Sequence, residues 1–220
     1  MNMLSYRIKT YRKAILWGLA LLISFLLLFV QCSASAEDVK AEPIKWIQTE
    51  QKVCAVTVTL TGIESDEALR LFMSVCRGAG IVPCIFATVD WIEEHSKELS
   101  VLEGAELGLL FSESPEKWTQ KRTMTAIAEA NDAFMVHTGT FPKYVRIAEG
   151  GCSQMVADLL SSYGQLLVGN GSVLSDPLQQ GQIVDCALLD STTGYALAQF
   201  YGNALSCGFT IVPLSDLLQS

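Results

Sequence analysis

The sequence predicts an α/β fold, a distorted (β/α) barrel of about seven strand-helix units in a single domain. From residue 52 onward, short runs rich in Val, Thr and other apolar residues alternate with stretches whose apolar residues recur at helical spacing. Strands that alternate with helices at this interval pair in parallel, with the helices outside the sheet. An open doubly wound sheet is the alternative, but no GxGxxG loop supports a nucleotide site.

The first half of the domain contains three of these units. The run VCAVTVTL, in which Val and Thr alternate with apolar residues, is typical of a strand. Ser65 then supplies an N-cap, and the two acidic residues that follow it lie in the first turn of the predicted helix. Pro115 suits the first turn of a long helix, in which Met124, Ile127, Asn131, Phe134 and Met135 form one stripe. The expected strands cover 52–60, 81–86 and 105–111, and the expected helices cover 65–80, 90–99 and 115–136.

The second half repeats the alternation with shorter elements. A polar loop with turn chemistry at Asp176-Pro177 interrupts it. The expected strands cover 143–147, 165–168, 183–188 and 209–212, and the expected helices cover 153–162, 192–206 and 214–218.

The N-terminus reads as a targeting segment. A basic stretch, Arg7 to Lys13, precedes an apolar run at 14–30, and Ala34-Ser35-Ala36 fits a signal peptidase site. Residues 1–36 are therefore a signal peptide or, alternatively, an uncleaved signal anchor. Residues 37–51 are a polar tether, and 52–220 form the domain. Either reading places the domain outside the cytoplasm, secreted or anchored by a single span.

The net charge and the cysteine content limit which partners and which kinds of cysteine site the domain can have. The net charge is −8, and loss of the basic leader would make the remainder more acidic, so phosphate backbones would repel it. We therefore expect no nucleic-acid partner and no membrane contact apart from the N-terminal segment. The cysteines after the leader sit largely in apolar runs without a CxxC, which favours buried thiols over a zinc cluster, with one or two disulfides as the alternative.

Three ring-bearing residues have simple structural interpretations. His95 lies beside charged residues on a short helix and is expected to be solvated. His137 is expected near the end of the long helix, where a basic group suits the helix dipole. Trp91 is expected in the core.

Four stretches together resemble the polysaccharide deacetylase (NodB homology) family. They are CIFATVDWIEEHSKEL, GAELGLL, TGTFPKYVR and GFTIVPLSDLL, at 84–99, 104–110, 138–146 and 208–218. The resemblance runs from about residue 52 to 219. It implies a distorted β/α barrel, a divalent metal such as zinc, and N-deacetylation of a carbohydrate polymer such as peptidoglycan or chitin.

The catalytic motifs of that family are replaced in this chain. The resemblance assigns metal-binding and acid-base roles to five positions that hold no carboxylate or imidazole, and it retains only the arginine, Arg146. The replaced positions are Leu60, Thr61, Leu110, Ser114 and Ala187. Metal-dependent deacetylation needs an activated water and a proton donor and acceptor within reach. The sequence therefore predicts a domain without catalytic residues, metal or cofactor.

Four residues remain candidates for a pocket at the strand ends: Arg146, Glu64, Glu113 and Glu149. The glutamates follow strands on the face where β/α barrels build their sites, although loop glutamates are common in an acidic domain. Arg146 could orient a ligand or hold an ion pair at the rim.

Three functions stay open. The first is an inactive deacetylase-like domain of the cell envelope that binds glycan or an envelope protein. The second is an active N-deacetylase with a rearranged metal site built from the three glutamates. The third is a purely structural module.

Overall fold

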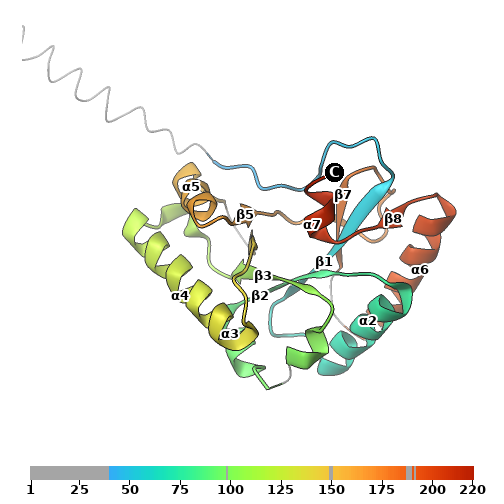
Figure 1. Ribbon diagram of the computed structural model, residues 1–220, viewed down its shortest axis with the longest axis horizontal. Helices are drawn as coiled ribbons and strands as arrows, with labels where there is room; N and C mark the ends of the chain where they lie inside the picture. Colours follow the sequence, from blue (N-terminus) through green and yellow to red (C-terminus); the bar gives the residue numbers. More distant parts are fainter. Residues whose placement is uncertain (1–39, 98, 149–150, 187–189, 191) are drawn as a thin grey trace, which may run out of the picture. The chain divides into compact units, whose positions relative to one another are not determined.

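The computed structural model describes residues 40–97, 99–148, 151–186, 190 and 192–220 (Figure 1). The predicted leader, residues 1–36, lies outside the described residues. Lys40–Ser220 form one compact unit. Within the described ranges, no helix combines the length and apolarity needed to cross a membrane.

A curled parallel sheet forms the centre of the domain, which confirms the predicted β/α barrel class. Its order is β5-β4-β3-β2-β1-β7-β6, and β8 pairs with the beginning of β1. Every strand pair is parallel. The strands are β1 (Val53–Leu60), β2 (Cys84–Ala87), β3 (Glu106–Phe111), β4 (Tyr144–Ile147), β5 (Leu166–Leu167), β6 (Ser172–Val173), β7 (Gln182–Cys186) and β8 (Thr210–Ile211).

Helices cover the outer face of the sheet in two groups (Figure 1). Helices α2 and α6 contact each other on one flank, while α4 contacts both α3 and α5 on the other. The short α7 packs against the inner face instead. The helices are α2 (Asp66–Ala79), α3 (Val89–Glu94), α4 (Gln120–Thr138), α5 (Gln154–Ser162), α6 (Thr192–Ser206) and α7 (Leu214–Leu217).

The long helix begins later than its sequence pattern predicts. Pro115–Lys117 form a separate 3-10 turn, and Thr119 caps α4 by accepting a hydrogen bond from the Arg122 backbone N–H. The predicted apolar stripe is only partly buried, because Met124 and Met135 are 42% and 37% exposed. The short strand β6 was not predicted, since it is two residues long and falls inside the polar loop.

Alternate residues of each strand divide the core into two layers. Residues such as Val58 and Leu109 pack between the sheet and the helices. Their neighbours, such as Phe86 and Leu110, point to the concave inner face, where Leu214 of α7 also packs. The period of two along each strand therefore decides which side chains can reach the interior of the barrel.

Residues 40–47, which we call the N-terminal strap, run along the barrel between β5 and β7. They fall in the segment predicted as a tether. The backbone N–H of Ile44 donates to Leu167 at 2.9 Å, and the N–H of Gly169 donates back to Ile44 at 2.8 Å. The Trp46 indole Nε1 donates to the Gln180 carbonyl at 2.6 Å. The strap thus supplies hydrogen bonds to a side of the sheet where β5 and β6 are short.

The six cysteines that the structure describes are free, and five of them are buried, as their apolar positions predict. Desolvation raises the pKa of Cys54 to about 11 and that of Cys76 to about 12. These thiols behave as small hydrophobic side chains.

Candidate functional site

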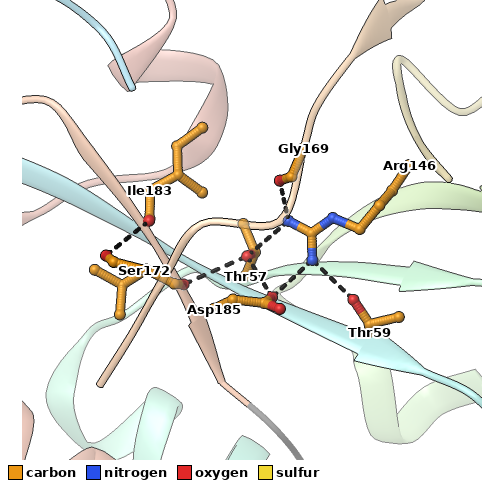
Figure 2. Close-up of polar contacts among 8 residues, drawn as sticks. Thr57, Thr59, Arg146, Gly169, Ser172, Ile183 and Asp185 are labelled. Atoms are coloured by element: carbon orange, nitrogen blue, oxygen red, sulfur yellow. Dashed lines mark hydrogen bonds and ion pairs between the residues drawn. The ribbon is translucent and has the colours of Figure 1, made fainter. Parts of the chain in front are cut away.

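A buried polar cluster occupies the concave face of the sheet, with Arg146 at its centre (Figure 2). The guanidinium is fully buried. Its Nη1 donates to Asp185 Oδ1 at 2.6 Å and to Thr59 Oγ1 at 2.8 Å. Its Nη2 donates to Thr57 Oγ1 at 2.9 Å and to the Gly169 carbonyl at 3.0 Å. Strands β1, β4 and β7 and the chain just after β5 therefore converge on one side chain.

Residues of β2 and β3 shape the space in which the Arg146 guanidinium lies. A Cβ on Gly108 would lie 2.6 Å from two atoms of the Phe86 ring, so only glycine leaves room for that ring in the barrel. The Phe86 ring in turn lies beneath the Arg146 guanidinium, with the Cζ atom 4.1 Å from the ring centroid. This is a cation–π contact in a dry environment, where such contacts are strongest.

Asp185, which sequence reasoning missed, completes the cluster. Its Oδ1 also accepts a hydrogen bond from Thr57 Oγ1 at 2.9 Å, and its side chain is 23% exposed, so this carboxylate reaches the rim of the cluster. Strand parity could have found it, because Asp185 follows the inward-facing Ile183 by two residues. Arg146 Nε is buried without a hydrogen-bond partner among the described residues.

The two leucines that the resemblance assigns to motif positions, Leu60 and Leu110, are buried core residues. Leu60 ends β1 on its outer side, fully buried in the layer between sheet and helices. Leu110 points the other way, into the concave core, and is 2% exposed. These two positions, on strands separated by β2, therefore face different layers of the barrel. Ala187 lies outside the described residues.

The two hydroxyl residues that the resemblance assigns to motif positions, Thr61 and Ser114, are hydrogen-bonded to other loop residues. Thr61 donates its hydroxyl to Glu64 Oε1 at 2.8 Å, and the Gly62 backbone N–H donates to Oε2 of the same residue at 2.8 Å. Ser114 donates its hydroxyl to the Gly151 carbonyl at 3.1 Å. The Glu64 carboxylate thus closes the loop after β1 and is not directed at Arg146.

The remaining predicted pocket residues are not brought together. Glu113 pairs with Arg122 at 3.1 Å, and both side chains are more than half exposed. Glu149 lies outside the described residues. No group of three or more His, Cys, Asp or Glu side chains could hold a metal ion in the part of the chain that the structure describes.

A divalent metal does not fit the described residues at the positions that the resemblance assigns to metal binding and acid-base chemistry. Buried Leu60 and Leu110 offer no donor atom, and an ion beside them would be desolvated without ligands. The carboxylate closest to the cluster, Asp185, is neutralised by Arg146. The cluster therefore holds an internal ion pair.

Both described histidines lie outside this cluster. His95, which was expected to be solvated, is half-buried, and its ring stacks on Trp91 with centroids 4.3 Å apart. Trp91 is buried in the core, as predicted. His137 lies in the last turn of α4, where its position was expected.

An open hollow of about 810 Å³ lies beside the barrel, between α3, the end of β3 and α4. We call it the α3–α4 groove. Leu109 and the small residues Ala126 and Ala130 line its apolar part. The Trp118 ring contacts the Phe111 ring edge-on, with centroids 5.7 Å apart. Of the predicted pocket residues, Glu113 lines this groove. Its charged and hydroxyl-bearing lining residues are Thr88, Asp90, Glu93, Ser112, Glu113, Thr119, Lys121, Arg122, Thr125 and Glu129.

No family model matches this sequence, and no curated protein matches it significantly. Solved structures do match the fold. A pseudoenzyme of carbohydrate esterase family 4 from Bacillus anthracis aligns with a TM-score of 0.70 at 15% identity, covering 83% of this chain and 70% of that one.

Two further structures align equally well. A family 4 carbohydrate esterase from Bacillus anthracis gives a TM-score of 0.69 at 17% identity, covering 80% of this chain and 87% of that one. A peptidoglycan N-acetylglucosamine deacetylase, Bc1960, gives 0.69 at 12% identity, covering 82% and 94%. The chain therefore has the fold shared by family 4 carbohydrate esterases and by a pseudoenzyme of that family.

Proposed function

We propose that this chain is an exported, catalytically inactive polysaccharide-deacetylase-like domain that binds glycan of the cell envelope. The observation that carries the proposal is the chemistry of the replaced motif positions. Leu60 and Leu110 contribute hydrocarbon to two opposite layers of the core, so restoring a ligand at either position means placing a polar group where the structure is apolar.

The state of Arg146 supports the same proposal. A catalytic arginine must have donors available to a substrate or to a catalytic carboxylate. Here both terminal nitrogens are already bonded to protein acceptors, and the ion pair with Asp185 is short and enclosed. We infer that Arg146 stabilises the interior of the barrel and does not take part in a reaction.

The alternative, an active deacetylase with a carboxylate-based metal site, has less support. It requires Glu64, Glu113 and Glu149 to converge. Glu64 accepts hydrogen bonds from the loop after β1, and Glu113 pairs with Arg122. Each described carboxylate of this set is therefore used locally.

Glycan binding in the envelope is suggested by the fold and by the predicted leader. Bc1960 is a peptidoglycan N-acetylglucosamine deacetylase, and another protein with the same fold is a pseudoenzyme. A domain that keeps this fold after losing the reactive groups can still retain affinity for the polymer. The alternative is that the domain binds an envelope protein. The co-sedimentation test described below distinguishes this alternative from glycan binding.

The catalytic part of the proposal is tested by incubating the purified full chain with N-acetylglucosamine oligomers and with peptidoglycan, in the presence of Zn²⁺. We expect no acetate release above the buffer control, and no stoichiometric metal by elemental analysis. Acetate release that a chelator abolishes would refute inactivity and support the carboxylate-based site.

The binding part is tested by co-sedimentation of the full chain with purified peptidoglycan. We expect retention that soluble glycan fragments compete away. A chain that stays in the supernatant with peptidoglycan and with chitin does not bind envelope glycan, and the protein-partner alternative then replaces it.

A further inference from the structure

We propose that the α3–α4 groove is the glycan-binding site, and that it prefers hexosamine polymers with free, protonated amino groups. This inference rests on the proposed function and adds the location and the ligand class. It follows from the volume, the lining and the charge balance of the groove.

The groove has the size of a ligand site, and the cluster around Arg146 does not. Its volume of about 810 Å³ lies within the range of roughly 300–1,000 Å³ that small-molecule sites occupy. The Arg146 guanidinium, in contrast, is fully enclosed by protein. A sugar chain can therefore enter the groove without displacing any core side chain.

The lining suits a ring that is apolar on its faces and polar at its edge. The half-buried Ala126 and Ala133 supply apolar contact, and the half-buried rings of Phe111 and Trp118 add aromatic surface. The Arg122 guanidinium packs against the Trp118 ring, with its Cζ atom 4.5 Å from the centroid. Hydroxyl and carboxylate groups surround this surface and can bind the hydroxyl groups of a sugar. A mixture of this kind is typical of sites that bind amphipathic, neutral or weakly charged molecules.

The charge balance selects among glycans. Four carboxylates and two cations line the groove, so its net charge is negative. Glu113 is paired with Arg122. The other three carboxylates, Asp90, Glu93 and Glu129, are exposed and have no ion-pair partner among the described residues. A protonated amine on the glycan therefore gains an attractive interaction that an acetamido group cannot provide.

Helix α4 positions these groups on one stripe. Arg122, Ala126, Glu129 and Ala133 recur at intervals of three or four residues, so they share the side of the helix that faces α3. The small residues at 126, 130 and 133 keep the space open. A larger side chain at Ala126, which is half-buried, would project into the groove.

The experiment measures the affinity of the purified full chain for glucosamine oligomers and for N-acetylglucosamine oligomers of equal length, by isothermal titration calorimetry at mildly acidic pH. We expect tighter binding of the glucosamine oligomer, weakened by added salt. Glu129→Gln removes one charge from the groove and should weaken binding by about threefold to tenfold. Asp132→Asn removes an exposed charge from the same helix outside the groove and should leave binding unchanged.

Ala126→Phe separates this inference from the proposed function. We expect it to weaken binding of both oligomers and of peptidoglycan. Peptidoglycan binding that survives both Ala126→Phe and Glu129→Gln would overturn the groove as the site while leaving the proposed function intact. Equal or tighter binding of the acetylated oligomer would overturn the charge preference. Tighter binding of oligolysine than of the glucosamine oligomer would show that the groove binds cationic peptides in preference to glycan, which would also contradict the proposal.

Discussion

Substitution of Asp185 by Asn should expose the dependence of the barrel on its internal ion pair. The change keeps the shape of the side chain and removes its charge. Arg146 is then left fully buried, with neutral acceptors from Thr57, Thr59 and Gly169 as its remaining partners. A buried cation without a counter-charge is the costly species in this arrangement.

The expected loss of stability follows from the geometry. Removing one partner of a buried ion pair costs about 3–5 kcal/mol. Asp185 is 23% exposed and Asn still offers an oxygen acceptor, so we expect Asp185→Asn to lower the free energy of unfolding by about 2–3 kcal/mol. Arg146→Met should cost less, because the remaining Asp185 carboxylate can be hydrated at the rim and Met can fill the space above Phe86.

The assay is urea denaturation of the full chain, followed by circular dichroism, with Asp132→Asn as a surface control. The double variant Arg146→Met, Asp185→Asn should be more stable than Asp185→Asn alone, because it removes the orphaned cation. If the double variant is less stable, or if Asp185→Asn matches the surface control, the ion pair does not stabilise the interior as argued.

Three further predictions concern the core. Leu60→Asp buries a carboxylate in the sheet–helix layer and should lower the free energy of unfolding by at least about 3 kcal/mol. Thr61→Asp changes an exposed position and should lower it by less than about 1 kcal/mol. Similar denaturation midpoints for the two variants would contradict the assigned layers. Gly108→Ala should destabilise by about 1–3 kcal/mol because its Cβ would meet the Phe86 ring at 2.6 Å, and an unchanged midpoint would show that the ring moves freely. Burial raises the pKa of the buried thiols, so the free energy of unfolding should hold below about pH 9 and fall toward pH 12. Alkylation of the native chain at pH 8, followed by mass spectrometry, should modify the exposed Cys207 well before the buried Cys54, Cys76, Cys84, Cys152 and Cys186. Uniform labelling of all six would contradict this.

The alternation of strands and helices was predictable because each strand carries its own signal. The run at 53–60 is rich in Val and Thr, and Ser65 caps the following helix as expected. Element ends were less predictable. Pro115 suits a helical first turn in either a 3-10 or an α-helix, and local sequence does not distinguish the two.

The candidate site was predictable only in part. Arg146 was identified from its motif, but its partner Asp185 was not, because the two residues are 39 positions apart and meet only across the curled sheet. The glutamates at 64 and 113 follow strands as predicted, yet Glu64 accepts hydrogen bonds from the loop after β1 and Glu113 pairs with Arg122 of α4. Sequence position indicates which edge of the sheet a residue reaches, and it does not indicate which neighbour it will bind.

The sequence by itself determined the fold class and the residue types at Leu60, Thr61, Leu110 and Ser114, none of which is a carboxylate or an imidazole, since both are properties of residue type and spacing along one chain. Tertiary structure alone decided that Leu60 and Leu110 serve opposite layers, that Arg146 is satisfied internally, and that open space lies between α3 and α4. The physical reason is that burial, pairing and cavity volume depend on atoms contributed by distant strands and helices. These quantities arise only when the sheet curls and brings those atoms together.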